Sequence, residues 1–502
     1  MPLSADVPGW DMFKNTGTNL HDIVAFNHTS LVRQNHGPGC GAYPTDPELA
    51  QGWKWLSDRS LELKLKQGVK YQDLPPMNGR EFVASDVVFT IEKQWPKMSW
   101  YKPITDAIDK IEAPDKYTVR INLKSPFAVF PDKAFMANVA NIVAPEIFEG
   151  KADLVRQDQN VGLGPFVLTS YVIGVKATQK RSPNYATIRP GLPYLDGLDQ
   201  YVIPDSSSQA AALRAGKLDF GTIQWEPAVI RDLQRTAPNL GSQVCPFETP
   251  PAITMRADKP PFNDVRVRRA ISMAVDREAL IRSVYVGMAW PTYSSITSML
   301  GDYHLPQDKL PADIRRYVEY HPDDAKKLLT EAGYPDGFET TVIFTPRYGS
   351  VHRGISEAMV DYLGKIGIKA KIEVREYGRY LDSVLAGGNY EGMSTLWPSS
   401  AGDPDTPLWD THHSTSTGRN RSHVNDPKMD KLLEAQRAAV DDAQRREIVY
   451  EAQRYWAQQL YYISFPQVPY AAFYQPYVKD VYHKAYDNKA KDDYMVFIWL
   501  DK

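Results

Sequence analysis

Short runs of alternating apolar and polar residues recur along this chain, and between them apolar residues recur at the three-and-four spacing of helices. Residues 60–65 (SLELKL) and 117–123 (YTVRINL) alternate as half-buried strands do. By the same criteria we expect further strands at residues 340–345 and 369–375, and helices at residues 84–95, 322–332, 351–366 and 377–385. Such a succession predicts an α/β protein with parallel or mixed sheets covered by helices.

The helix expected after His321 has the clearest signals at its two ends. Pro322 suits the first helical position, where no backbone donor is needed, and Asp323 and Asp324 favour the positive end of the helix dipole. Gly333 can close the helix in a left-handed conformation. The sequence therefore predicts a helix that begins at Pro322 and ends just before Gly333.

The chain has 502 residues, and single hydrophobic cores stop growing near ~250 to 300 residues, so we expect two lobes. The proline-containing stretch at residues 245–261 is the most plausible crossing between them. A net charge of −3 gives no general attraction for nucleic acid or an anionic membrane. The sequence has no signal-like start and no apolar run of membrane length, so the chain as given is expected to be soluble.

The chain has two cysteines, Cys40 and Cys245, which are far apart in the sequence. Their spacing allows a disulfide in an oxidising compartment and also allows two buried thiols. Metal-binding pairs such as CxxC are absent. The cysteines therefore leave both the redox compartment and their own pairing open.

Known catalytic motifs are absent, since the sequence contains no GxSxG, HExxH, GxxxxGK[ST] or strand-linked GxGxxG motif. His412 and His413 stand in a polar stretch that is expected to leave them in solvent. Asp403 is expected to begin a turn, and Asp405 or Asp410 to cap the next element of the chain. We therefore expect a protein that is not an enzyme and that uses no cofactor and no metal.

The stretch at residues 259–289 (KPPFNDVRVRRAISMAVDREALIRSVYVGMA) combines an aromatic-bearing loop, a helix cap at Asn263 and Asp264, and an amphipathic helix. It resembles a signature of the extracytoplasmic solute-binding proteins of family 5, the peptide- and nickel-binding class that feeds ABC importers. Leu163 departs from the family pattern, which usually has Thr there. Other family-like segments occur in the family's order at residues 47–53, 59–88, 161–166, 213–220, 321–338 and 403–435.

The resemblance implies a two-lobed periplasmic-binding-protein fold of type II, of the large cluster C type, with mixed sheets and a hinge. The first lobe then spans residues 1–250 and includes an extra subdomain, and the second spans residues 251–470. Residues 471–502 return to complete the first lobe. The return crossing is expected near residues 465–473, so that two crossings form the hinge.

The same resemblance implies a monomeric substrate-binding component of an ABC importer. It would capture a peptide-sized solute between its lobes and deliver it to the transmembrane permease subunits. The implied location is periplasmic or otherwise extracytoplasmic, with an export segment removed and a lipid anchor left open. The alternatives are an oligosaccharide or an anionic opine or organic acid as the solute, and less favoured are a metal-chelate binder or an enzyme or receptor on this fold.

Two positions define ligand recognition in the dipeptide-binding members of the family: an Arg takes the ligand carboxylate and an Asp takes the ligand amine. Arg347 matches the first position. At the family's interval Ser400 takes the second, so the acid is missing and Asp403 is the nearest one. Because a buried ammonium needs a charged or multiply hydrogen-bonded partner, free-amine peptides become less favoured ligands.

Aromatic and neutral polar residues supply the other candidate contacts. Trp397 precedes the missing acid, and Trp100 lies where the metal-binding branch of the family has a ligand-facing Trp. We expect Trp397 and Arg347 to form a stacking platform and a polar anchor on the second lobe. The candidates expected around them are Tyr348 and Trp225, with Asn27, His28 and Trp100 facing them from the first lobe.

Overall fold

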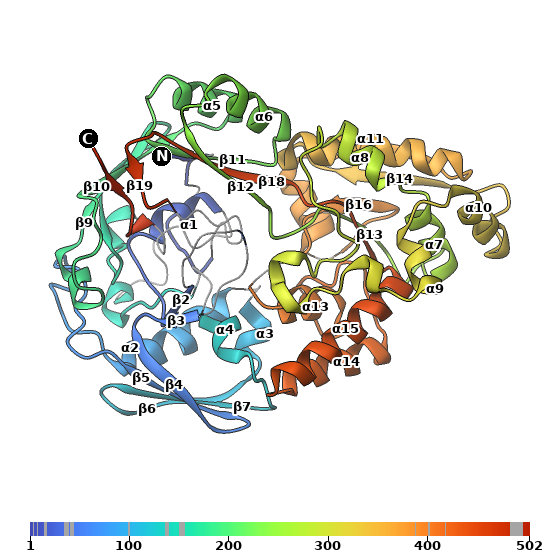
Figure 1. Cartoon of the computed structure of the whole chain (residues 1–502). Coiled ribbons are helices and arrows are strands. Elements are labelled where there is room, and N and C mark those ends of the chain that lie inside the picture. Colours follow the sequence, from blue (N-terminus) through green and yellow to red (C-terminus); the bar gives the residue numbers. More distant parts are fainter. Residues whose placement is uncertain are drawn as a thin grey trace.

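The structure is a computed structural model, and it describes the chain except for residues 4, 8, 15–17, 35–39, 41–44, 99–100, 136–139, 150–155, 387, 400–401, 417 and 482–494. The described residues form two lobes of mixed α/β structure, and strands run between the lobes near the middle of the molecule (Figure 1). The N-terminus and the C-terminus both lie on the first lobe.

The first lobe contains three of the larger sheets. One has the order β4-β5-β7-β6, formed by β4 (Ala50–Ser57), β5 (Ser60–Leu65), β7 (Thr118–Leu123) and β6 (Ile108–Asp115). Another has the order β1-β10-β9-β8, formed by β1 (Pro2–Leu3), β10 (Gly197–Val202), β9 (Lys176–Arg181) and β8 (Phe166–Val172). The third has the order β11-β18-β12, formed by β11 (Phe220–Gln224), β18 (Pro469–Tyr474) and β12 (Gly241–Pro246).

Helices and short strand pairs complete this lobe. The helices are α1 (Thr18–Val24), α2 (Ala84–Phe89), α3 (Lys102–Thr105), α4 (Phe130–Phe135), α5 (Ser206–Arg214) and α6 (Pro227–Thr236). The short pairs are β2 (Val32–Gln34) with β3 (Thr45–Pro47), and β19 (Val478–Lys479) with β20 (Trp499–Leu500).

The second lobe is built on one mixed sheet with the order β15-β14-β16-β13-β17. Its strands are β15 (Lys369–Val374), β14 (Glu339–Phe344), β16 (Met393–Leu396), β13 (Ala252–Met255) and β17 (Tyr462–Ser464). Its helices are α7 (Val265–Met273), α8 (Arg277–Ser283), α9 (Ala312–Arg315), α10 (Pro322–Glu331), α11 (Gly349–Lys365), α12 (Tyr377–Tyr380), α13 (Asp405–His412), α14 (Pro427–Ala438) and α15 (Asp442–Gln459).

The chain passes between the central sheets of the two lobes at two places. Residues 247–251 lead from β12 to β13, and residues 465–468 lead from β17 back to β18. β18 then lies between β11 and β12 and pairs antiparallel with both. A strand from near the C-terminus is therefore the central strand of a first-lobe sheet.

The predicted strands and helices are confirmed, with small shifts at their ends. β5 and β7 pair antiparallel, whereas β14 and β15 pair parallel. α10 covers Pro322–Glu331, and Gly333 has the expected left-handed φ of 94°. The helix expected at residues 84–95 begins as α2 and continues as a π-helical turn over Thr90–Gln94. Local patterns therefore predicted the elements well.

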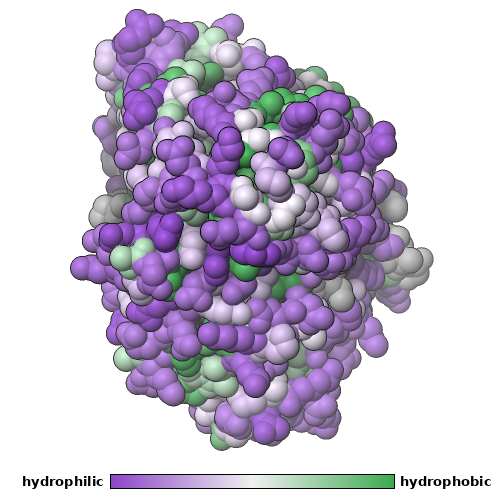
Figure 2. Space-filling model, turned by 90° about the vertical axis from the view of Figure 1, so that its right-hand side faces the viewer, coloured by the Kyte–Doolittle hydropathy of each residue, from purple (hydrophilic) through white to green (hydrophobic). Residues whose placement is uncertain are grey.

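The hydrophobic cores lie where the amphipathic patterns predicted them. In α7, Val267, Ala270 and Ile271 are fully buried and belong to one cluster with Val342 of β14. Asp264 caps this helix, because its side chain accepts a hydrogen bond from the backbone N–H of Arg266. The face of the second lobe in Figure 2 is mostly hydrophilic with small separate hydrophobic areas, as expected for a lobe with a filled interior.

Cys40 and Cys245 form a disulfide, so the question that their spacing left open is answered. Their Cα atoms are 5.5 Å apart, and the bond ties Cys40 to β12, directly before the first crossing. Among the residues that the structure describes, no helix is both long and apolar enough to cross a membrane.

Candidate binding cleft

A cleft of about 350 Å³ lies between the two lobes, where the end of β11 and the start of α6 face the start of α11. The first lobe contributes mainly polar side chains to its wall, and the second contributes the loop that carries Arg347. The lining includes Asp22, Ser206, Thr222, Gln224, Trp225 and Glu226 from the first lobe, and Pro346, Arg347 and Gly349 from the second.

An aromatic cluster joins this cleft to the first crossing. Trp225 lies directly after β11 in the first lobe, Trp397 lies directly after β16 in the second, and Phe247 lies in the crossing itself. The ring centres of Trp225 and Trp397 are 5.1 Å apart, and Phe247 lies 5.5 Å and 5.2 Å from them. Two of the predicted ligand contacts are therefore brought together from opposite lobes.

The two tryptophans have features that ordinary core residues lack. Trp225 has a positive φ of 59°, which a bulky residue rarely adopts and which clusters at functional sites. The indole N–H groups of Trp225 and Trp397 are both buried and have no hydrogen-bond partner within the described part of the chain. Because buried donors normally find partners, these two N–H groups are candidate ligand contacts.

Tyr348 and His352 complete the aromatic cluster behind Trp397. Their ring centres lie 6.2 Å and 4.5 Å from that of Trp397. Burial raises the pKa of the Tyr348 hydroxyl well above its usual value. Burial also lowers the pKa of His352 from 6.5 to about 3, so this imidazole is neutral at physiological pH. The structure thus places Tyr348 as a packing partner of Trp397.

Arg347 is exposed on the second-lobe wall of the cleft, directly before α11. Arg347 forms no ion pair among the described residues, although Glu226 also lines the cleft. Glu226 is instead bound to the second lobe, since it accepts hydrogen bonds from the backbone N–H and the hydroxyl of Ser350, the latter at 2.7 Å. Arg347 therefore lines the cleft without an ion-pair partner among the described residues.

Asn27 and His28 lie inside the first lobe, with exposed fractions of 1% and 0%. The loop that contains Gly162 and Gly164 runs across them so closely that a Cβ atom at Gly162 would be 2.3 Å from the backbone oxygen of Asn27. Burial lowers the pKa of His28 to about 3. The family-like VGLGPF segment is thus a packing element over this pair.

Trp100 and Ser400, two further predicted contacts, lie outside the described residues. Ser399 and Asp403, on either side of Ser400, are both held by side chains of the second lobe. The hydroxyl of Ser399 donates to Asp410 at 3.1 Å and accepts from Arg419 at 2.7 Å. Asp403 receives two hydrogen bonds from Arg445, at 2.6 Å and 2.7 Å. The acid nearest to Ser400 is therefore already neutralised.

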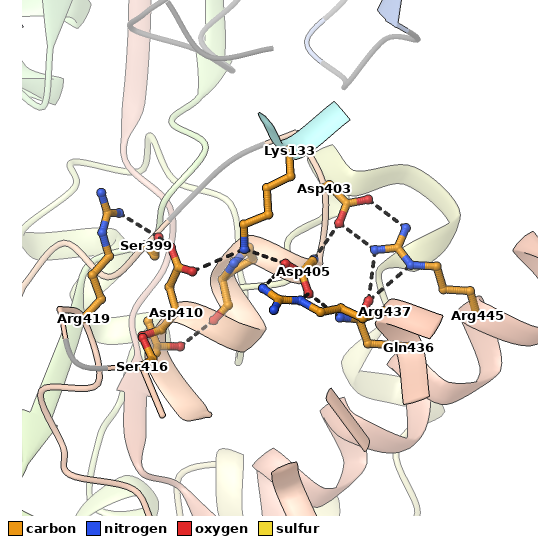
Figure 3. A network of polar contacts seen from close by, with 12 residues as sticks. Lys133, Ser399, Asp403, Asp405, Asp410, Ser416, Arg419, Gln436, Arg437 and Arg445 are labelled. Carbon is orange, nitrogen blue, oxygen red and sulfur yellow. Dashed lines mark hydrogen bonds and ion pairs between the residues drawn. The ribbon is translucent and has the colours of Figure 1, made fainter. Parts of the chain in front are cut away.

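Asp405 and Asp410 do not cap a helix, so that expectation is wrong. α13 begins at Asp405, the residue before it is Pro404, and both carboxylates are instead buried in a network of ion pairs (Figure 3). Burial alone raises the pKa of Asp405, but Arg437 and Lys133 outweigh it and hold this pKa far below its usual range. A buried carboxylate needs such partners, and they come from remote parts of the sequence.

The expectation that His412 and His413 are solvated is also wrong. α13 extends through His412, which is fully buried against Trp456 with ring centres 4.7 Å apart. Burial lowers the pKa of His412 to about 4. His413 is 4% exposed and stacks on Trp409 at 3.6 Å. The polar residues before this pair therefore form a helix with a buried face, which the polar composition of the segment did not indicate.

The fold and the cleft define a two-lobed solute-binding protein. The model of the bacterial extracellular solute-binding proteins, family 5, matches residues 45–419, and the chain belongs to this family. The expected fold class is confirmed as well, since solved two-lobed binding proteins superpose on the whole chain.

Curated relatives have a similar length and a moderate identity. The di/tripeptide-binding protein 1 of Pseudomonas aeruginosa is 28% identical over 459 residues, which cover 87% of this chain and 82% of that protein. The glutathione-binding protein of Salmonella typhimurium is 28% identical over 417 residues, which cover 81% of this chain and 77% of that protein. These similarities extend over both lobes.

Solved structures support the fold. The periplasmic binding protein DppA of Helicobacter pylori, in complex with the peptide STSA, has a TM-score of 0.81 and 23% identity, and the match covers 100% of this chain and 97% of that one. The binding protein AgaA of A. tumefaciens R10, in complex with agropinic acid, has a TM-score of 0.83 and 23% identity, with 100% and 98% covered.

Proposed function

We propose that this chain is the extracytoplasmic substrate-binding component of an ABC importer, and that it captures a peptide-like solute in the interlobe cleft and delivers it to the permease. The two crossings, residues 247–251 and 465–468, act as the hinge. Ligand contacts from both lobes then shift the population toward the closed form by their higher affinity for it. Small-angle scattering tests the hinge, since an unchanged radius of gyration at saturating solute would contradict closure.

The solute carries an acidic group and does not depend on a free amine. The observation that supports this most directly is the contrast between Arg347 and the acids after Trp397. Arg347 has no acidic partner in the described chain, whereas Asp403, Asp405 and Asp410 are each engaged by a cation of the protein itself. A guanidinium is well suited to a carboxylate, and each of the three acids after Trp397 is already paired with a cation of the protein.

The aromatic cluster fits the body of such a solute. Trp225 and Trp397 offer ring faces and unpartnered indole N–H groups beside the cleft. Flat rings of this kind stack on apolar groups and on sugar faces. Two structural neighbours bind different solutes, a peptide in one case and agropinic acid in the other. An acidic peptide-like compound is the first candidate solute. An acidic opine of the agropinic type is the second, because the rings of Trp225 and Trp397 can stack on its sugar-derived part.

Calorimetric titration with matched ligand pairs tests the proposal. The panel contains a free dipeptide, its N-acetyl derivative, the same dipeptide with an amidated C-terminus, glutathione and agropinic acid. We expect N-acetylation to leave the affinity nearly unchanged and C-terminal amidation to lower it more than tenfold, because a charged hydrogen bond is lost. Submicromolar binding that requires a free amine would refute the proposed solute class.

A pair of arginine variants tests where the carboxylate of the ligand binds. Arg347→Ala is expected to abolish the difference between the acid and the amide, whereas Arg353→Ala, an exposed residue on α11, is expected to leave it intact. Equal effects of the two substitutions would place the carboxylate elsewhere in the cleft.

A further inference from the structure

One first-lobe side chain enters the ion network of the second lobe. Lys133 lies on α4, and only 7% of its side chain is exposed. Its ammonium contacts Asp405 at 2.5 Å and Asp410 at 3.3 Å, so it bridges two carboxylates that lie more than 270 residues further along the chain (Figure 3). The ion network consists of Lys133, Asp403, Asp405, Asp410, Arg437 and Arg445.

The network is complete only when the lobes touch. Asp403 pairs with Arg445 and Asp405 pairs with Arg437, and all four belong to the second lobe. Asp410 has one ion-pair partner in the described chain, and that partner is Lys133. Separation of the lobes therefore removes the cation of Asp410 and leaves the other two pairs intact.

A second contact supports the same seam between the lobes. The backbone N–H of Ala128, just before α4, donates to the backbone oxygen of Arg437 at 2.9 Å. The guanidinium of Arg437 also lies 4.3 Å from the ring centre of Phe127. Residues 127–133 thus dock on α14, the helix whose arginine already holds Asp405.

Asp410 connects this seam to the segment next to the cleft. One carboxylate oxygen faces Lys133, and the other accepts the hydroxyl hydrogen of Ser399 at 3.1 Å. Ser399 lies two residues after Trp397 and directly before Ser400, the position of the family's missing acid. A carboxylate with fixed partners on both oxygens has one orientation, so the first lobe and Ser399 are coupled through one side chain.

We propose that Lys133 is a positioning residue that stabilises the closed form and, through Asp410, fixes the segment that carries Trp397 and Ser399. Opening removes the one ion-pair partner that Asp410 has among the described residues, and the loss of this charge-assisted hydrogen bond disfavours the open form. The proposal rests on the proposed function only in that closure encloses the solute. It predicts that part of the drive toward closure is present in the protein without solute.

The test measures interlobe distance in ligand-free protein. Dyes on Lys110→Cys of the first lobe and Lys431→Cys of the second, both exposed positions, report the open and closed populations by single-molecule energy transfer. Lys133→Met is expected to raise the open-to-closed ratio about tenfold. Lys102→Met is the matched control, because Lys102 is exposed and pairs with Asp106 within its own lobe, and it is expected to leave the ratio unchanged.

Asp410→Asn gives an independent test, since it removes the charge and keeps an oxygen that can accept from Ser399. We expect it to raise the open-to-closed ratio by less than Lys133→Met does, because Lys133→Met also removes the contact with Asp405. The double variant is expected to add little to Lys133→Met, because that substitution already breaks the pair with Asp410. The backbone amides of the non-proline residues in 397–399 and 402–411 are expected to exchange hydrogen at least about fivefold faster in both variants.

Three outcomes would overturn the proposal: a wild-type ratio in Lys133→Met, additive effects in the double variant, or faster exchange without a change in the interlobe distance. If Lys133→Met does not fold, Asp410→Asn decides by the same distance measurement. Because no solute is used, the result is independent of the solute panel. If the panel refutes the proposed solute class, the role proposed for Lys133 is unaffected. If the distance measurement refutes the role of Lys133, the proposed solute class is unaffected.

Discussion

Two of the seams between the lobes have opposite chemistry. Beside the first crossing, Trp225, Phe247 and Trp397 meet as aromatic rings, whereas on α4 a single ammonium meets two buried carboxylates. Apolar contacts are non-directional and tolerate small rotations, whereas charged hydrogen bonds need a defined geometry. The aromatic seam is therefore suited to remain in contact while the lobes rotate, and the ionic seam is suited to respond to full closure.

The largest expected effect is a loss of folding stability when Asp405 of the ionic seam is replaced. Asp405→Asn leaves Arg437 without its carboxylate in a buried site and leaves Lys133 with Asp410 alone, which is expected to lower the free energy of unfolding by about 3 to 5 kcal/mol. Urea unfolding followed by circular dichroism measures this loss. Asp361→Asn is the control, because Asp361 forms an exposed pair with Lys365 and is expected to contribute less than about 1 kcal/mol. A loss of unfolding free energy smaller than that of Asp361→Asn would show that the ion pairs of Asp405 do not stabilise the fold.

The next largest expected effect is a loss of solute affinity when Trp397 of the aromatic seam is replaced. Trp397→Ala removes stacking and buried area and is expected to weaken solute binding by about 2 to 4 kcal/mol, with the fold intact. Titration with the tightest ligand of the panel measures it, and Trp499→Ala is the control, since Trp499 is 40% exposed and lies on β20. Wild-type affinity in Trp397→Ala would mean that the solute lies elsewhere in the cleft.

The smallest expected effect is a pH dependence of folding stability that arises at the aromatic seam. The pKa of His352, which packs on Trp397, is lowered by burial from 6.5 to about 3, so the unfolded chain binds a proton in this range that the folded chain does not. Its contribution to stability is therefore lost as the pH falls from about 6.5 toward 3, with a slope of about 1.4 kcal/mol per pH unit. The pKa of Asp405 is held far below its usual range, so this carboxylate of the ionic seam keeps its charge in the same interval.

Urea midpoints measured from pH 7 to pH 4.5 check this prediction. His352→Gln is expected to flatten the slope by about 1.4 kcal/mol per pH unit. Parallel slopes for the wild type and His352→Gln would contradict a neutral, buried His352.

The two seams also differ in how far the sequence predicts them. Helices and strands such as α10 and β5 can be predicted from local periodicity, and Trp397 and Arg347 were identified from a family resemblance at fixed spacing. The partners of Asp405 were not predictable in this way, because Lys133 precedes it by 272 residues and its role depends on contact between the lobes. A buried carboxylate and a helix-capping carboxylate look the same in one sequence.

Burial of polar side chains was the other quantity that local patterns missed. Asn27 and His28 were expected at the cleft, and their burial depends on the close passage of Gly162, which is more than 130 residues away. The disulfide likewise joins residues separated by 205 positions. In each case a remote segment determines the environment, so the information is in the sequence but not in the neighbourhood of the residue.

The position of β18 has a consequence for the order in which the protein is made. The sheet of the second lobe is encoded by one continuous stretch, from β13 at Ala252 to β17 at Ser464. The first lobe begins earlier, yet β11 and β12 lack their shared central strand until residues 469–474 have been synthesised. During translation those two strands keep unpaired edges, which are sites for mispairing. The lobe that is started first is thus the one that is finished last.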